Sequence, residues 1–246
     1  MSRLRPVLVV EHEAMCPPGW MGEWLERDGV ALDVRRPYAG DPLPDDLAGH
    51  AGMMVLGGSM GATDDAAHSW LRRVKELIRR AADEAVPVLG ICLGHQLAAV
   101  ALGGSVHRNQ RGQQVGLLEV GWTTPADVDE LTHPLVGDQV GAMRALQWND
   151  DIVTELPGFC MVLAYAPHGE VQAARFAPTV WGVQWHPEAG EQIVRRWAEH
   201  DRDRIRERGL DVDALVAEVA TATAELLTTW RPLAGSFARV VLRTAR

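Results

Sequence analysis

A cysteine between two glycines lies where a strand is predicted to turn into a helix. The stretch is PVLGICLGHQ, residues 87–96, with Cys92 two positions after Gly90 and two before Gly94. Glycines at these positions relieve crowding in a sharp strand-to-helix turn that presents the cysteine above the sheet. The helix start places amide N–H groups and a positive dipole end beside the sulfur, which favours a thiolate. Because buried free cysteine is also common in ordinary packing, this pattern alone leaves Cys92 either reactive or structural.

A base and its orienting group follow about ninety residues later. The segment VWGVQWHPE, residues 180–188, ends a predicted strand with His186, Pro187 and Glu188. A cysteine nucleophile needs a base that takes its proton and returns it to the leaving amine, and histidine suits neutral pH. Two residues apart on an extended segment, His186 and Glu188 point the same way, so the carboxylate can fix the tautomer of the imidazole.

A third glycine-rich segment, VLGGSMG (55–61), follows another predicted parallel strand. Glycines at the carboxyl end of a strand let backbone N–H groups line a crevice, which is where ligands bind in open α/β folds. One such amide, together with the Leu93 amide after the cysteine, could stabilise a tetrahedral oxyanion. Taken alone, a pair of glycines after a strand is more often only a turn.

The elements that must position these residues alternate between strand and helix. Short apolar runs bounded by Gly or Pro predict buried parallel strands at 7–10, 30–34, 53–57 and 86–91. Helices are predicted at 19–29 and 69–85, the second with Ser69 as its N-cap. This order predicts a doubly wound α/β sheet. Residues 105–122 are typical of antiparallel strands at one edge. Three more strands, joined by tight turns, are predicted at 160–166, 171–177 and 179–186.

The last part of the chain is predicted to be helical. A helix over 191–209 stops at Gly209, and a second, capped by Asp211 or Asp213, runs over 213–230 and ends before Pro232. We therefore expect a main domain over residues 1–198 and a C-terminal helical extension over residues 199–246.

Composition narrows the function classes. The net charge of -9 argues against a general nucleic-acid surface, and no apolar run approaches membrane length. Three scattered cysteines form neither a disulfide framework nor a CxxC metal site, and the histidines show no metal-ligand spacing. There is no P-loop and no Gly-rich nucleotide fingerprint. Without metal-ligand spacing or a nucleotide motif, we expect neither a metal nor another cofactor. No signal peptide is recognisable, so we expect a cytoplasmic, reducing location.

These motifs and their order resemble the class I glutamine amidotransferase family. The residues that carry the likeness are GICLGHQ, VQWHPE and LGGSMG, within roughly residues 5–190. Within the family, the sequence resembles stand-alone GMP synthase-like members. The resemblance implies a flavodoxin-like fold and hydrolysis of the glutamine side-chain amide through a γ-glutamyl thioester. By motif position Cys92 is the nucleophile, His186 the base and Glu188 its orienting group, and the Gly58 and Leu93 amides form the oxyanion hole.

The same resemblance implies a glutamine pocket that includes Gly57, Gln96, Trp148 and Asn149. Gln96 matches a position that helps hold the α-amino acid end of glutamine. The segment LQWNDD, residues 146–151, departs from the family, where relatives typically have Trp-His followed by a small residue. Ser59, in place of the usual proline, and Trp185, in place of the usual phenylalanine, are smaller departures.

Three functions stay open at this point. The first is a glutaminase that supplies ammonia to an acceptor or to a separate synthetase subunit. The second is a hydrolase of γ-glutamyl peptides that uses the same Cys-His-Glu residues. The third is a non-catalytic binding or regulatory protein on this fold, which the intact motif positions argue against. Two further residues near the motifs, His95 and Cys16, are expected to be structural, although His95 could act as a base and Cys16 could contact substrate.

Overall fold

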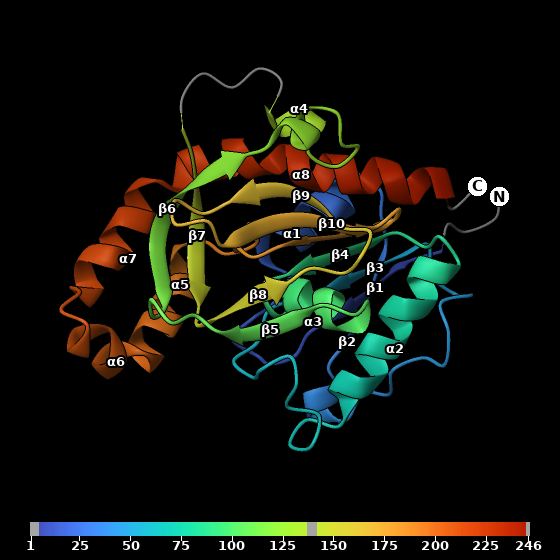
Figure 1. Cartoon of the computed structure of the whole chain (residues 1–246), viewed down its shortest axis with the longest axis horizontal. Helices are drawn as coiled ribbons and strands as arrows, with labels where there is room; N and C mark the ends of the chain where they lie inside the picture. Colours follow the sequence, from blue (N-terminus) through green and yellow to red (C-terminus); the bar gives the residue numbers. More distant parts are fainter. Residues whose placement is uncertain (1–4, 137–141, 245–246) are drawn as a thin grey trace.

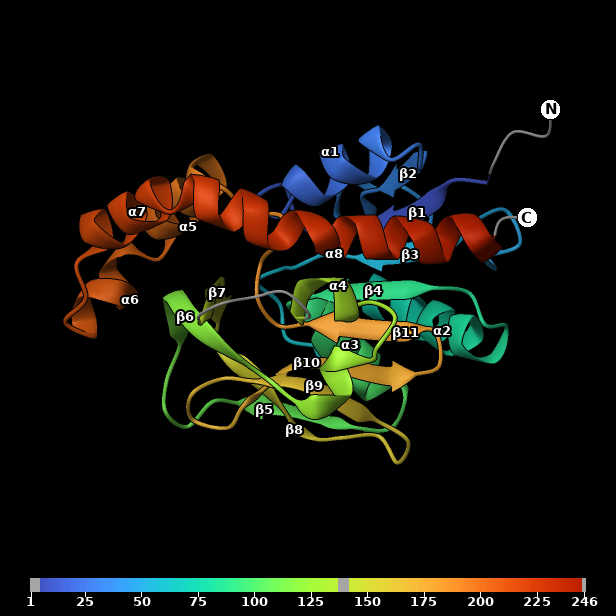
Figure 2. The same cartoon turned by 90° about the horizontal axis from the view of Figure 1, so that it is seen from above.

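The computed structural model describes residues 5–136 and 142–244, which form a large twisted sheet with helices on both faces (Figures 1 and 2). The strand order in the nine-stranded sheet is β2-β1-β3-β4-β11-β10-β9-β6-β7. The expected flavodoxin-like α/β class is confirmed, because four parallel pairings join the first five strands of this order. The antiparallel part is as extensive, since four antiparallel pairings join β11 to β7.

The parallel strands are β1 (Val7–Val10), β2 (Leu32–Arg35), β3 (Gly52–Val55), β4 (Val88–Ile91) and β11 (Val180–Val183). The antiparallel strands are β6 (Gln114–Trp122), β7 (Met143–Asn149), β9 (Met161–Tyr165) and β10 (Val171–Ala177). A separate two-stranded sheet pairs β5 (Ser105–Arg108) with β8 (Asp151–Glu155).

The helices are α1 (Gly19–Arg27), α2 (Trp70–Asp83), α3 (Leu93–Ala101), α4 (His133–Val136), α5 (Glu191–His200), α6 (Arg202–Glu207), α7 (Val212–Thr221) and α8 (Thr223–Thr244). Among these residues, no helix is both long and apolar enough to cross a membrane.

Strand β1 shows how the sequence divides the core between the two faces of the sheet. Successive side chains of a strand point to opposite faces. Val7 and Val9 accordingly belong to a cluster that includes side chains of α1, α5 and α8, and Leu8 and Val10 to a second cluster with α2 and α3. Figure 2 shows α1 and α8 on one side of the sheet and α2 and α3 on the other. All four residues are fully buried, so the apolar run reflects a strand covered on both faces.

The C-terminal helices differ from the sequence prediction in two places. Pro232 lies inside α8 and does not end it. Proline removes one helical hydrogen bond, but burial of Trp230, Leu233 and Phe237 against the sheet continues the helix beyond it. The predicted helix over 191–209 is also divided, because Asp201 leaves helical geometry between α5 and α6.

Of the two helix N-caps predicted from the sequence, the one at α7 is confirmed and the one at α2 is not. Asp211 caps α7 by accepting hydrogen bonds from the Asp213 and Ala214 amides, whereas the Ser69 side chain makes no capping bond at α2. The residues predicted as an extension pack with residues of the sheet in one hydrophobic cluster. A domain boundary at residue 198 stays a prediction.

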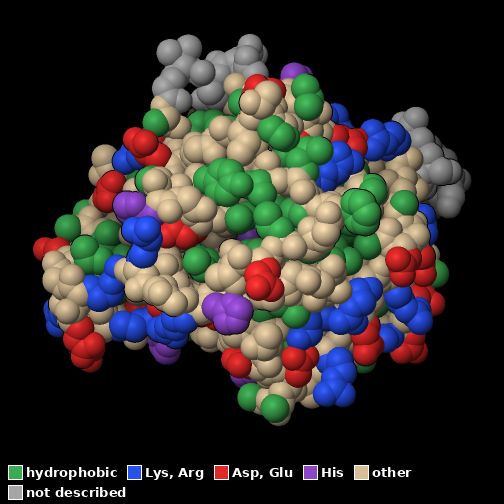
Figure 3. Space-filling view, in the orientation of Figure 1, with side chains coloured by type: hydrophobic (Ala, Val, Ile, Leu, Met, Phe, Trp, Pro, Cys, Tyr) green, Lys and Arg blue, Asp and Glu red, His purple; other side chains and the backbone are tan. Residues whose placement is uncertain are grey.

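The face of the molecule seen in Figure 3 carries hydrophobic side chains near its centre, over β9 and β10. The exposed large hydrophobic residues of β9 and the loop before it are Leu156, Phe159, Met161 and Tyr165. Charged side chains lie mainly toward the margins of this face (Figure 3).

Candidate active site

Cys92 lies at a sharp turn between β4 and α3, as the two flanking glycines predict. Its backbone has φ 51° and ψ −104°, a left-handed conformation that is unusual for a residue with a side chain. A Cβ on Gly94 would lie 2.1 Å from the Val55 carbonyl oxygen, and one on Gly90 would lie 2.4 Å from the Gly94 carbonyl. Only glycine therefore lets β3, β4 and α3 pack this closely, and the turn places Cys92 at the carboxyl end of the sheet.

His186 reaches the same edge because β11 pairs with β4 in parallel, with Gly182 opposite Gly90 and Val183 opposite Ile91. Three residues beyond this register, the His186 amide donates to the Leu146 carbonyl of β7. The imidazole Nδ1 lies 2.7 Å from Glu188 Oε1, and both side chains are almost completely buried. The other ring nitrogen, Nε2, is buried and has no hydrogen-bond partner in the described residues. It is therefore the nitrogen available to a thiol or a leaving group.

Burial and charge act on His186 in opposite directions. Burial alone would lower the pKa of the imidazole, but the Glu188 carboxylate and the Cys92 side chain raise the pKa of His186 to about 10. At neutral pH this favours the imidazolium form. A protonated imidazole beside a cysteine is the arrangement that stabilises a thiolate and can later protonate a leaving amine.

Gly57 is the point at which the candidate groups meet. A Cβ on Gly57 would lie 3.0 Å from His186 Cε1, 3.7 Å from Cys92 Cβ and 3.7 Å from Cys16 Sγ. A side chain here would separate the cysteine from the imidazole, so this position must stay small.

Gly58 and Leu93, whose amides sequence reasoning assigned to an oxyanion hole, are neighbours in the structure, and the oxyanion hole itself stays a prediction. A Cβ on Gly58 would be 3.0 Å from Leu93 Cδ2. Leu93 is the first residue of α3, so its N–H has no acceptor within the helix. An unpaired amide next to the sulfur is suited to stabilise a developing negative charge.

A cavity of about 320 Å³ opens over Cys92. It is lined by Glu13, Met15, Cys16, Gly58, Ser59, Met60, Cys92, Gln96, Gln113, Trp148, Asn149, Asp150, Asp151, His186, Trp197, His200, Asp201 and Arg204. Gln96, Trp148 and Asn149 thus line the same cavity as Cys92, and their contact with glutamine stays a prediction. Gly57, Leu93 and Glu188 are not among the residues that line it.

One wall of the cavity is an amide network. The Gln96 side chain donates to the Asp151 carbonyl at 2.9 Å and to Gln184 Oε1 at 3.2 Å. The Asn149 side chain also donates to the Asp151 carbonyl, at 3.1 Å, and to Gln114 Oε1. This network holds the segment that departs from the family, and it fixes the orientation of both amide groups.

A further part of the lining comes from the junction of α5 and α6, which sequence reasoning missed. Trp148 Nε1 donates to Asp201 Oδ2 at 2.8 Å, and Arg204 donates to Asp201 at 3.0 Å and to Asp150 at 2.6 Å. The Trp197 ring lies 4.6 Å from that of His186, centroid to centroid. The sequence signal was Asp201 and Arg204 three residues apart on a helix, a spacing that is equally common on a solvent face.

The remaining candidates differ in their surroundings. His95 is completely buried, packs on Phe176 and close to Gly182, and does not line the cavity. Burial lowers the pKa of His95 to about 4, so it is a neutral packing residue as expected. Cys16 lines the cavity and donates to Glu13. Among residues 5–136 and 142–244, no group of three or more His, Cys, Asp or Glu side chains could hold a metal ion.

Comparison with known proteins points to one family. Residues 27–194 match the family model described as glutamine amidotransferase class-I. The chain is 32% identical over 172 residues to gamma-glutamyl peptidase 4 of Arabidopsis thaliana, covering 69% of this chain and 66%, slightly under two thirds, of that protein. It is 34% identical over 167 residues to one subunit of the glutamine-hydrolyzing GMP synthase of Methanosarcina barkeri, covering 64% of this chain and 78% of the relative.

A solved glutamine amidotransferase from Thermotoga maritima has the same fold. Its TM-score is 0.83 at 24% sequence identity, over 97% of this chain and 99% of the other. At this coverage the structural likeness extends into α8, beyond the region that the family model matches.

Proposed function

Because this chain belongs to the class I glutamine amidotransferase family, we propose that it hydrolyses the side-chain amide of glutamine or of a γ-glutamyl compound through a thioester on Cys92. The observation that carries the proposal is the meeting of Cys92, His186 and the Gly57-Gly58 turn at the floor of one cavity.

In the first half of the reaction the Cys92 thiolate attacks the γ-carbonyl carbon. The carbonyl oxygen becomes an oxyanion that the Gly58 and Leu93 amides stabilise. His186 then transfers its Nε2 proton to the leaving nitrogen, the C–N bond breaks, and ammonia or an amine leaves the γ-glutamyl thioester. Glu188 is a positioning residue in this scheme, since it accepts from His186 Nδ1 at 2.7 Å.

In the second half, His186 takes a proton from water and the resulting hydroxide attacks the thioester carbonyl. The C–S bond breaks, glutamate leaves, and the proton returns to the Cys92–His186 pair. Gln96, Trp148 and Asn149 form the wall against which we place the α-amino acid end of the substrate, with Gly57 beneath it.

The two kinds of relative favour different substrates for this chain. The GMP synthase relatives favour free glutamine and a separate synthetase subunit that consumes the ammonia. The plant relatives favour γ-glutamyl peptides. We further propose a cytoplasmic location, where a reducing environment keeps the candidate nucleophile as a thiol.

Glutamine and a panel of γ-glutamyl dipeptides, assayed side by side with wild type and Cys92→Ala, test the proposal. We expect turnover of at least one substrate and a loss of about 10⁴-fold or more in kcat for Cys92→Ala, as in other nucleophile deletions. Full activity in the variant would reject the assignment of Cys92. Absence of turnover and of acylation, even with co-purifying proteins added back, would reject the function itself.

A further inference from the structure

Glu13 is a carboxylate in the lining of the cavity that contains Cys92 and His186. It lies in the loop after β1, and its Oε1 accepts from Cys16 Sγ at 3.3 Å while its Oε2 accepts from the Ser59 hydroxyl at 2.7 Å. Cys16, His186 and Cys92 all lie within 4 Å of the position that a Cβ on Gly57 would occupy. The two hydrogen bonds therefore fix the Glu13 carboxylate in the lining of the cavity that also contains Cys92 and His186.

The other acidic residues of the cavity have cationic neighbours. Asp150 contacts both Arg204 and Arg108, and Asp201 contacts Arg204. Asp151 has Arg108 close by, and burial raises the pKa of its carboxyl. Glu13 differs from Asp150 and Asp201, because no described Lys, Arg or His side chain forms a salt bridge with it. Asp151 forms no salt bridge with a described residue either, but it has the charge of Arg108 beside it.

The Glu13 carboxylate lies in a different part of the lining from the residues against which we place the α-amino acid end of the substrate. In the proposed reaction the leaving amine receives its proton from His186, and the α-amino acid end lies against the wall formed by Gln96 and Asn149. Glu13, Cys16 and Ser59 form a different wall, with hydrogen bonds of their own. Since the Glu13 carboxylate has no salt-bridge partner among the described residues, an ammonium group attached to the leaving nitrogen would find its counter-charge in this part of the lining.

On this basis, which rests on the proposed function, we propose that Glu13 is a specificity-determining residue. The pocket selects γ-glutamyl amides whose leaving amine carries an ammonium group at its far end, in addition to the α-ammonium group of the glutamyl part. A γ-glutamyl diamine has such a charge. A γ-glutamyl amino acid instead presents a carboxylate to Glu13, and like charges brought together at close range are unfavourable. Each Glu13 oxygen retains a lone pair that an ammonium group can use.

Three probes of similar length separate charge from size. They are the γ-glutamyl amides of 1,4-diaminobutane, pentylamine and 4-aminobutanoic acid, which carry a cationic, neutral and anionic end. For the wild type we expect kcat/KM to be about tenfold higher for the cationic probe than for the neutral one, since hydrogen bonds to charged groups are worth about that factor. The anionic probe should be the poorest substrate of the three.

Glu13→Gln removes the charge with little change in shape, and Glu13→Ala serves if the first variant unfolds. The expected result is a cationic-to-neutral ratio near one, with Glu23→Gln, an exposed residue of α1, retaining the wild-type ratio. A wild type without preference, or a Glu13→Gln variant that keeps the preference, would overturn the inference while leaving the proposed hydrolysis intact. Failure of every γ-glutamyl probe and of glutamine to react would instead remove the proposed function, and this inference with it.

Discussion

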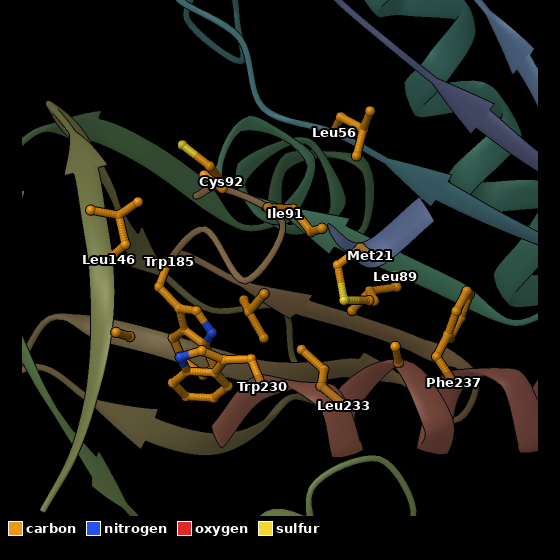
Figure 4. Close-up of a cluster of buried hydrophobic side chains, with 14 of the residues drawn as sticks. Met21, Leu56, Leu89, Ile91, Cys92, Leu146, Trp185, Trp230, Leu233 and Phe237 are labelled. Carbon is orange, nitrogen blue, oxygen red and sulfur yellow. The ribbon is translucent and has the colours of Figure 1, made fainter. Parts of the chain in front are cut away.

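The ring of Trp230, on α8, packs 4.8 Å from the ring of Trp185, the residue immediately before His186 (Figure 4). Both tryptophans are buried, and Trp122 also contacts both of them. The C-terminal helix therefore supports the segment that carries the candidate base, and the tryptophan that replaces the usual phenylalanine before His-Pro-Glu has a packing partner there.

Trp230→Ala tests this support. The loss of a buried aromatic side chain should lower the free energy of unfolding by about 3–5 kcal/mol, measured by urea denaturation. Because the cavity lies beside Trp185, kcat should also fall at temperatures where the variant is folded. Trp230→Phe is the matched control and should retain most of both properties; equal effects of the two substitutions would contradict this account.

Gly94→Ala tests the geometry of the turn. Its Cβ would lie 2.1 Å from a backbone oxygen of β3, which has no flexible side chain to move away. We expect a loss of about 4 kcal/mol or more in stability, or no folded protein, which exceeds the usual range for one substitution. Gly49→Ala, where nothing lies within 4 Å of the added carbon, is the control and should change stability little.

Glu188→Gln tests the origin of the His186 pKa. Burial lowers the pKa of the imidazole, and the Glu188 charge opposes this effect. Without that charge, the pKa of His186 should fall from about 10. The alkaline limb of kcat/KM should therefore move from near pH 10 toward neutral pH, with a decrease in rate of roughly a hundredfold. An unchanged alkaline limb would mean that another group titrates there. Glu191→Gln, in an exposed pair with Arg195, should leave the profile as it is.

The same pKa predicts how stability depends on pH. Since the folded-state value lies above the ordinary value of 6.5, His186 stabilises the folded state fully below about pH 6.5. This contribution is lost as the pH rises toward 10. Thermal melts from pH 6 to 10 should show a decline that is smaller in Glu188→Gln; parallel declines in both proteins would contradict it.

Asp201→Asn tests the wall formed at the junction of α5 and α6. The substitution weakens the bonds from Trp148 and Arg204, so the wall against which we place the substrate should loosen while Cys92 and His186 keep their positions. KM should increase by about five- to tenfold, close to the value of one charge-assisted hydrogen bond, and kcat should change less. Asp203→Asn, an exposed neighbour on α6, is the control. A large fall in kcat with unchanged KM would place Asp201 in a different role.

Local sequence signals predicted the buried strands and the turn at Cys92. Runs such as VLVV at 7–10 are strands because β-rich apolar residues between two helical layers have no polar face, and the glycines around Cys92 identified the turn. The proximity of Cys92 and His186 could be expected from motif order and from the rule that parallel strands end at one edge.

Long-range packing decided what was missed. Pro232 was expected to end a helix, but the buried residues that follow it continue α8 along the sheet. Asp201 and Arg204 look like solvent-facing charges in the sequence, and only their approach to Trp148 and Asp150, some fifty residues earlier, makes them part of the cavity. No local periodicity carries that information.

The central claim, that Cys92 is the nucleophile, is tested most directly by covalent labelling with 6-diazo-5-oxo-L-norleucine, a glutamine analogue that loses N2 when a thiolate attacks it. Peptide mass spectrometry should find a single adduct on Cys92, with Cys16 and Cys160 unmodified and no adduct in Cys92→Ala. Inactivation accompanied by labelling of Cys16 while Cys92 remains free would contradict the account.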